Sequence, residues 1–497
     1  MKIHTLHRFA VSILMFMLCF TARSQELSIK WSADALLSSG TKEALPFWAR
    51  TGHHGIIPDR TSGLAEAGFD LGYMSADSVF FEVGSAMAGR CFPGQGGGLK
   101  ADGIVDRLYV SGGWRMFRLD LGMRPRRSEL GPLSLTGGNM VWTDNVRNMP
   151  GIDLRADWIY VDRGHVVGIR GNLAHYQPVD NRYVKGMMIH DKSLELKFTF
   201  DGKVELSGGM EHIVQWGGFS PSEGRQPSSF RDYLKVFFAC KGGKDAHVSD
   251  QLNALGNHLG REYVRLLLRQ DVFNITFQYD KPYEDYSGTR FQNFPDGVWT
   301  MKFSLSDRNA AVTDLLYEFV STTLQSGPVH DRPATPDEIA EQDPDSPFYG
   351  RVVLGGCDDY FNNSIYRSGW TYYGRTIGLP LINGVAFNED GVAVRLQNNR
   401  IRAHHFGVSG NVWKLPYTFK ATYSRNYGCY GQAESSFYTS KPWQLSLALE
   451  ACVNNKVTRM PVDIHLGLYS DVGELYPDSF GLTLKFSYAG SRLFKKS

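Results

Sequence analysis

Two short segments combine aromatic rings with planar amide, carboxylate and guanidinium groups, a combination that suits the binding of sugars. A sugar stacks its apolar face on Trp or Tyr, and planar polar groups take its hydroxyls, because each desolvated hydroxyl needs a partner. The alternative interpretation is that Asn, Asp and Gly shape tight turns here while the aromatic rings pack inside the protein. The predicted carbohydrate-binding residues are Trp142, Asp144, Asn145 and Arg147 in the first segment and Trp370, Tyr372, Tyr373 and Arg375 in the second.

Catalytic motifs are absent from the sequence. It has no GxSxG, HExxH or Walker sequence, and the glycine run at 94–98 lacks the third glycine of a dinucleotide fingerprint. The pairs His53-His54 and His404-His405 resemble metal ligands, but neighbours in a strand face opposite sides and do not share one ion. We therefore expect a protein that is not an enzyme and has no metal or cofactor.

The elements that must position these residues are strands, because apolar residues recur at every second position along most of the chain. Successive side chains of a strand point to opposite faces, so such a strand has one apolar and one polar face. The alternation is clear at residues 117–124, 194–200, 273–279, 443–449 and 482–488. Together with an export signal and an undivided length, it predicts an all-β fold, a large closed antiparallel transmembrane β-barrel.

The export signal occupies the first 24 residues. Lys2 and Arg8 form a basic start, residues 9–20 an apolar stretch, and Ala22-Arg23-Ser24 a small-x-small site with cleavage after Ser24. Removal of this segment leaves 50 Lys and Arg against 51 Asp and Glu. A chain with so little net charge gives no indication of a nucleic-acid partner.

Residues 25–497 show no division into domains. The one candidate linker, an acidic and proline-rich stretch at 327–347, is interpreted as a long surface loop because strand patterning resumes after it. At about 229–258 the apolar spacing becomes helical, with Ser229 as a cap and Gly242-Gly243 as a stop. We expect a small helical insert that acts as a plug of the barrel, with a cap as the other possibility.

Five cysteines remain after cleavage, and none are close enough in sequence for a CxxC motif. Cys429 and Cys452 lie on consecutive predicted strands. In the oxidising cell envelope these two could form a disulfide, a pairing that the sequence leaves open.

Five segments of the chain are rich in Gly, Asn, Trp, Tyr, Arg and Asp. By their order along the chain and the strand patterning around them, the chain resembles the Wzi family of capsule-assembly outer-membrane proteins in its Bacteroidetes form. The resemblance implies a barrel of about 18 strands with a helical plug at the periplasmic end. It also implies a lectin-like role in holding capsular polysaccharide at the cell surface. The segments are 46–71, 129–154, 208–218, 256–260 and 360–382.

These features predict a protein of the bacterial outer membrane whose partners are a surface polysaccharide, such as capsule, and the membrane lipid. Two alternatives stay open. The first is a channel for sugars or nutrients, which needs an open lumen. The second is a barrel hydrolase acting on lipid or glycan, which needs a nucleophile, a base and an orienting group in contact. The chain also departs from the common aromatic C-terminus, because Lys495, Lys496 and Ser497 follow Phe494.

Overall fold

The computed structural model describes residues 25–94, 98–327, 331–346, 349–353, 356, 358–432 and 436–496. The predicted signal peptide lies outside the described residues. Within them, no helix has the length and apolar character needed to cross a bilayer.

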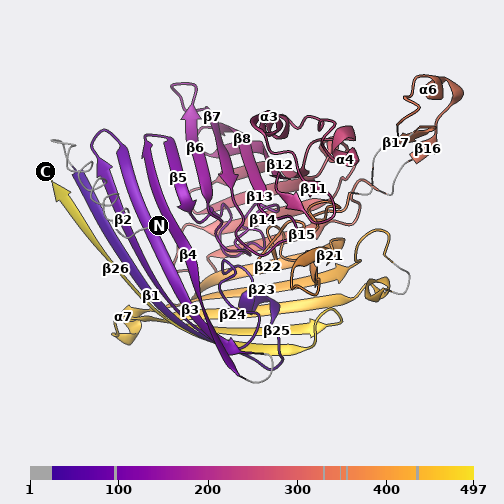
Figure 1. The fold of residues 1–497 in the computed structure, drawn as a ribbon. Coiled ribbons are helices and arrows are strands. Elements are labelled where there is room, and N and C mark those ends of the chain that lie inside the picture. The colour runs from indigo at the N-terminus through magenta and orange to yellow at the C-terminus, as the bar shows by residue number, and fades with distance from the viewer. Residues whose placement is uncertain are drawn as a thin grey trace, which may run out of the picture.

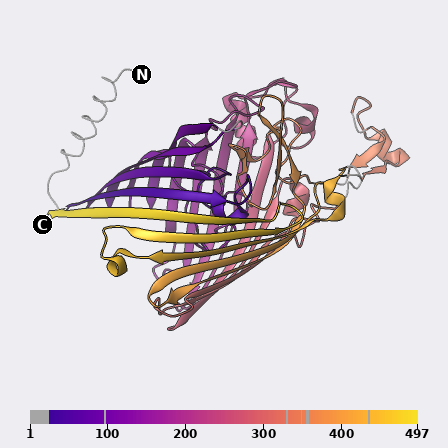
Figure 2. The same ribbon diagram turned by 90° about the horizontal axis from the view of Figure 1, so that it is seen from below.

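Eighteen antiparallel strands close into one barrel (Figures 1 and 2). Each pairs with the next barrel strand along the chain, and the first pairs with the last, so that Gln25 lies opposite Lys496. The predicted closed all-β barrel is thereby confirmed. Its strands are β1 (Gln25–Gly40), β2 (Ser62–Ser75), β3 (Val79–Pro93), β4 (Leu99–Trp114), β5 (Phe117–Met123), β6 (Gly151–Tyr160), β7 (Val167–Tyr176), β8 (Met188–Phe200), β9 (Val204–Trp216), β12 (Asn257–Arg269), β13 (Phe273–Tyr283), β14 (Gly297–Leu305), β15 (Asp314–Ser321), β22 (Ile401–Val412), β23 (Leu415–Asn426), β24 (Trp443–Val453), β25 (Asp463–Gly473) and β26 (Ser479–Lys496).

Shorter elements lie in the connections between these strands. The helices are α2 (Phe47–Arg50), α3 (Phe230–Phe237), α4 (Val248–Leu252), α5 (Tyr286–Thr289), α6 (Pro336–Ala340), α7 (Asn455–Thr458) and the 3-10 helix η1 (Phe437–Ser440). The two-stranded pairs are β10 (Phe219–Ser220) with β11 (Gly224–Arg225), β16 (Asp331–Pro333) with β17 (Arg351–Val353), β18 (Thr371–Tyr372) with β19 (Arg375–Thr376), and β20 (Asn383–Phe387) with β21 (Ala393–Asn398).

The two ends of the barrel differ in the length of their connections. The end that holds Gln25 and Lys496 has mostly short turns, such as 201–203 and 413–414, and we call it the turn end. The opposite end, the loop end, has the long connections 41–61, 124–150, 217–256 and 322–400. This asymmetry is typical of outer-membrane barrels.

The acidic stretch 327–347 belongs to the longest of these connections. Its described part forms β16 and α6, which project away from the barrel together with β17 (Figure 1). Thr335 caps α6 through a capping box with Glu338, and Pro336 takes the first helical position. This part of the chain therefore has local structure of its own beside the barrel.

The two faces of the wall follow the predicted alternation. In β8, Leu194 and Leu196 are exposed on the outer face, whereas Glu195 and Lys197 point into the lumen and are buried. His404 and His405 of β22 also separate: His404 contacts Tyr317 outside the wall, and His405 is fully buried inside. These two histidines cannot share an ion, as expected. Further exposed apolar side chains on strands include Leu119, Phe277, Leu449, Leu468 and Leu482.

The hydrophobic core lies inside the barrel, because three long connections fold into the lumen. These are residues 41–61, 124–150 and 358–383, which we call the lumen plug. Their apolar side chains pack against one another and against inward residues of the wall such as Ile213 and Leu259. The plug side chains in this core include Phe47, Trp48, Met140, Trp142, Tyr360, Trp370 and Ile377.

The helical insert forms at the predicted place, but it does not plug the lumen. His190 and Lys192 of β8 share the outer face with Leu194, since no bulge interrupts the pairing of this strand. The His190 ring lies 5.4 Å from Tyr233 and 5.5 Å from Phe237 of α3, and Lys192 donates to the Phe237 carbonyl. The insert therefore covers the outside of the wall, and the expectation of a helical plug is corrected. Aromatic residues at helical spacing indicated an amphipathic helix but not which face of the wall it meets.

The two cysteines considered for pairing are both free. Cys429 is buried in the connection between β23 and β24 at the loop end, where its thiol lies 3.2 Å from the Leu396 carbonyl oxygen. Cys452 lies near the other end of β24, toward the turn end. The length of β24 thus separates them.

Candidate functional site

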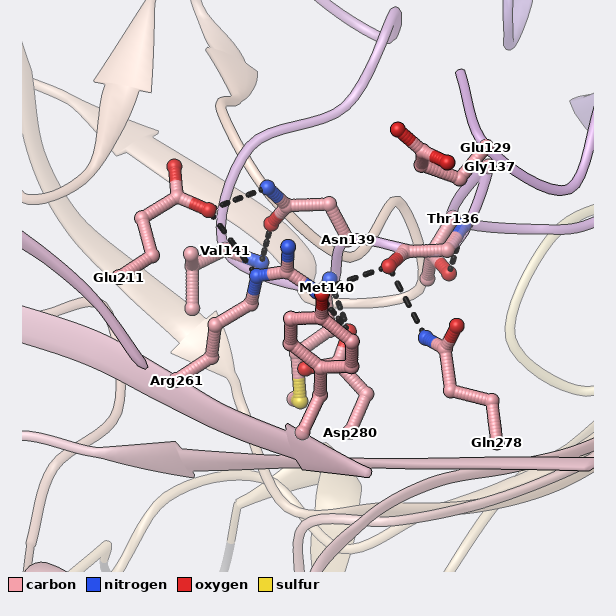
Figure 3. Close-up of polar contacts among 12 residues, drawn as sticks. Glu129, Thr136, Gly137, Asn139, Met140, Val141, Glu211, Arg261, Gln278 and Asp280 are labelled. Atoms are coloured by element: carbon pink, nitrogen blue, oxygen red, sulfur yellow. Dashed lines mark hydrogen bonds and ion pairs between the residues drawn. The ribbon is translucent and has the colours of Figure 1, made fainter. Parts of the chain in front are cut away.

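The plug segment 124–150 is fastened to the wall on the side of β9, β12 and β13 (Figure 3). The Asn139 side-chain amide donates to Glu211 of β9 at 2.6 Å, and Arg261 Nε of β12 donates to the same carboxylate at 3.0 Å. The Met140 backbone N–H donates to Asp280 of β13 at 2.9 Å. Charge-assisted hydrogen bonds in a water-poor interior hold the backbone in one place.

The same segment also reaches other parts of the wall. His405 Nε2 of β22 lies 2.8 Å from the Leu133 carbonyl oxygen, and the Asn148 amide donates to the Asp106 carbonyl of β4 at 3.0 Å. Several strands separate β4 from β22 in both directions around the barrel. The segment therefore spans the lumen, and its bonds to the wall make it a fixed partition.

Four of the predicted site residues are buried in this plug. Trp142 is 6% exposed, and Asn145 donates its amide to the Thr376 carbonyl at 2.9 Å. Trp370 and Tyr372 have no exposed surface. Their side chains pack the lumen and join its segments, so the structure gives them contacts that hold the plug together.

Asp144 is the exposed member of the first segment. Its side chain and that of Trp142 line a cavity of about 150 Å³, together with Arg126 and Arg170. The Asp144 carbonyl accepts the His54 backbone N–H at 2.8 Å, which joins plug segments 124–150 and 41–61. Asp144 and Trp142 thus meet at this cavity, and a smaller cavity of about 30 Å³ brings both together with Arg147, whereas Arg375 lines neither.

The two predicted arginines, Arg147 and Arg375, come together at the loop end. They line a cavity of about 440 Å³, which we call the loop-end cavity. A second cavity of about 250 Å³ adjoins it and shares Asp59 and Arg375. The residues that line the loop-end cavity are Gly55, Ile57, Pro58, Asp59, Arg60, Arg90, Phe92, Gly94, Lys100, Arg147, Tyr373 and Arg375.

A tight hairpin presents Tyr373 and Arg375 to this cavity. The strands β18 and β19 are joined by Tyr373 and Gly374, whose φ angles are 49° and 73°. Two positive φ angles are the signature of a type I′ turn, which suits a two-residue hairpin and favours glycine or asparagine. A tyrosine in this conformation costs roughly 1 kcal/mol or more, a strain that functional sites often retain. Tyr373 as a whole residue is 43% exposed.

Arg375 ties the hairpin to plug segment 41–61. Its guanidinium donates to the Arg50 carbonyl at 2.7 Å, to the Ile57 carbonyl at 2.9 Å and to the Asp59 carboxylate at 2.5 Å. Burial would raise the pKa of Asp59, but Arg375 and Arg50 outweigh it and lower the pKa. Asp59 is therefore ionised, and Arg375 is a well-anchored part of the cavity wall.

Arg147 lies against the same hairpin but is held differently. Its guanidinium carbon is 4.0 Å from the centroid of the Tyr373 ring, a cation–π contact. Among the residues that the structure describes, Arg147 forms no ion pair, and its Nε is buried without a hydrogen-bond partner. Because Nε is buried, the donors available to a ligand are the terminal Nη atoms, which form no hydrogen bond within the described structure.

Three cationic residues of the cavity were not predicted from the sequence: Arg60, Arg90 and Lys100. Arg90 and Lys100 come from the facing ends of β3 and β4, where Phe92 pairs with Lys100 and Arg90 with Asp102. No local spacing links them to Arg147 or Tyr373. The register of the β3–β4 hairpin is the signal that could have placed two of them side by side.

The chemistry of the cavity is that of polar recognition with one aromatic surface. Over the described ranges, no group of three His, Cys, Asp or Glu side chains is arranged to hold a metal ion. Guanidinium and ammonium donors, one carboxylate and an exposed tyrosine line the space. Such a set can stack a sugar ring and bond its oxygen atoms.

Comparison with known proteins places the fold. No family model and no curated protein matches the sequence. Among solved structures the chain is similar to Wzi of Escherichia coli, an outer-membrane protein involved in group 1 capsule assembly that is a carbohydrate-binding β-barrel. The two share 12% identity, the match covers 96% of this chain and 86% of that chain, and the TM-score is 0.53. It is also similar to OccK5 (OpdH) of Pseudomonas aeruginosa, with 9% identity over 94% of this chain and 98% of that chain and a TM-score of 0.45. The likeness to Wzi shows a shared fold, that of an outer-membrane β-barrel.

Proposed function

We propose that this protein is inserted in the outer membrane, binds a capsular or other surface polysaccharide at its loop end, and helps to attach or assemble that polymer at the cell surface. The observation that carries the proposal is the loop-end cavity, where the exposed Tyr373 ring lies beside the unpaired guanidinium of Arg147. The fold shared with a carbohydrate-binding barrel supports it.

Orientation in the membrane brings this cavity to the outside of the cell. Barrels of this class have short periplasmic turns and longer extracellular connections. The turn end, with Gln25 and Lys496, then faces the periplasm, and the cavity faces the medium where capsule is held. The apolar side chains that alternate along the outer wall suit contact with lipid.

Binding uses the fixed plug as a scaffold. A sugar ring packs on the exposed part of Tyr373, while Arg147 and Lys100 donate to its oxygen atoms. Because Arg375 already bonds two carbonyls and Asp59, the hairpin that carries Tyr373 needs little further ordering on binding. The plug itself opposes the channel alternative, since segment 124–150 is bonded to β4, β9 and β22 across the lumen.

A cellular test follows from this proposal. A strain without the gene is complemented with the wild type, with Arg147→Gln or with Lys414→Gln, an exposed residue of the turn end that serves as the matched control. We expect cell-bound polysaccharide to fall for Arg147→Gln and to stay at the wild-type level for Lys414→Gln, with equal amounts of each protein in the membrane. Unchanged surface polysaccharide in the strain without the gene would contradict the proposal.

A further inference from the structure

The loop-end cavity is strongly cationic. Of its twelve lining residues, five are Lys or Arg and one is Asp. A sugar made only of hydroxyl and acetal oxygens does not require such charge, because neutral amide and hydroxyl groups can also satisfy its hydrogen bonds. The cationic residues are Arg60, Arg90, Lys100, Arg147 and Arg375.

Protein carboxylates neutralise only part of this charge. Arg375 is paired with Asp59, and Arg90 is paired with Asp102. Arg60 has a long contact of 3.9 Å with Glu43. In the part of the chain that the structure describes, neither Arg147 nor Lys100 forms an ion pair. Asp102, which pairs with Arg90, is near enough to offset in part the effect of burial, which lowers the pKa of Arg147.

The two unpaired cations border the same space. Lys100 is exposed, so solvent reaches its ammonium group. Arg147 is half-buried, and burial, together with the nearby positive charge of Arg90, lowers its pKa. An anion beside Arg147 would offset both effects, since an opposite charge within about 4–6 Å favours the charged form.

We propose that the loop-end cavity selects an acidic sugar, a uronic acid residue of the polysaccharide, whose carboxylate is bound by Arg147 and Lys100 while its ring packs on Tyr373. The planar fork of a guanidinium matches a carboxylate, and the ammonium adds a compact second charge. Specificity then comes from charge, because a neutral sugar leaves both cations without a partner. This inference rests on the proposed function and names the sugar class that the site recognises.

The test compares one polymer with and without its carboxyl groups. Polysaccharide released from the surface of the source strain is used as it is, and also after carbodiimide activation and borohydride reduction, which convert its carboxyl groups to primary alcohols. Binding of both forms to the purified full-length barrel in detergent is measured by calorimetry. We expect the reduced polymer to bind roughly 10- to 150-fold more weakly, the range of a lost charge-assisted hydrogen bond.

Variants locate the effect in this cavity. Arg147→Gln and Lys100→Gln should each weaken binding of the native polymer and leave binding of the reduced polymer unchanged, whereas Lys414→Gln should change neither. Raising the salt concentration from about 0.05 M to about 0.5 M should weaken binding of the native polymer alone, because salt screens exposed charges.

The outcomes separate the inference from the proposed function. Equal binding of native and reduced polymer overturns the selection of acidic sugars but leaves polysaccharide binding in place. Charge-dependent binding that survives both Gln substitutions also overturns it, because the anion then binds elsewhere. If neither polymer binds the folded wild type, the proposed function itself is wrong.

Discussion

Plug segment 124–150 carries two arginines that make opposite use of the same side chain. Arg126 stacks on Trp142 at 4.3 Å and pairs with Asp191 at 3.1 Å and Glu211 at 2.7 Å. Arg147 stacks on Tyr373 at 4.0 Å and pairs with no carboxylate in the described structure. The difference lies in the acids around each guanidinium, not in its aromatic partner.

This contrast separates a structural charge from a charge available to a ligand. Burial alone would lower the pKa of Arg126, but Asp191 and Glu211 raise it above its ordinary value. For Arg147 the balance is reversed, and its pKa is lowered. A guanidinium that the protein has already neutralised holds the plug in place, whereas one that it leaves unsatisfied attracts an anion.

The largest expected effect comes from removing the partition itself. Replacement of residues 129–145 by a short Gly-Ser linker should raise the conductance of the barrel, because this segment spans the lumen, while segments 41–61 and 358–383 of the plug remain. Single-channel recordings in planar bilayers measure the change. The matched variant lacks the helical insert 230–256 and should stay closed, since α3 contacts the outer wall. Channels in that variant, or in the wild type, would refute the assignment of the plug.

The second effect concerns the structural arginine. Arg126→Ala leaves Asp191 and Glu211 buried without this partner, and breaking a buried ion pair costs about 3–5 kcal/mol. We expect faster amide hydrogen exchange in residues 124–150 while the barrel strands stay protected. Unchanged exchange would show that Arg126 is not what fixes the plug.

The third effect concerns the arginine with no acidic partner. Arg147→Ala should weaken polysaccharide binding by roughly 5- to 150-fold, because it removes hydrogen bonds worth about 1–3 kcal/mol. Hydrogen exchange in the plug should match the wild type, in contrast to Arg126→Ala. Loss of plug protection in this variant would erase the distinction between the two residues.

The smallest effect is expected at the hairpin turn. Tyr373→Asn removes the aromatic surface, worth about 0.5–1.5 kcal/mol in ring contacts, so binding should fall by roughly 2- to 13-fold. Asparagine tolerates the positive φ of 49° better than tyrosine does, so thermal stability should be equal or higher. Binding at the wild-type level would show that the ring is not a sugar platform.

The sequence specified the wall of the barrel well because strand alternation is a local signal. Outer residues such as Leu194 and inner residues such as Glu195 fall where the two-residue period puts them. Ser229 caps α3 and Thr335 caps α6, and both caps are equally local. The two-residue period of the strands does not encode whether an insert packs inside or outside the barrel. The helical insert is expected in the lumen, but α3 packs on the outer face of the wall.

The candidate site was only partly predictable for a related reason. The composition of residues 142–147 and 370–375 indicated sugar chemistry, but Trp142 and Trp370 became plug core while Arg147 and Arg375 lined a cavity. The distinction depends on contacts with segments far away in sequence. Arg375, for example, bonds Asp59, and this contact exists only after both segments fold into the lumen.

The most direct test of the account is the affinity of the purified full-length barrel for polysaccharide released from its own cells, measured by calorimetry for the wild type, Arg147→Gln and Lys414→Gln. We expect saturable binding by the wild type and by Lys414→Gln, and binding weakened by roughly 5- to 150-fold in Arg147→Gln. Equal affinities of all three proteins would show that the loop-end cavity is not the site. Absence of binding by the folded wild type would contradict the central claim.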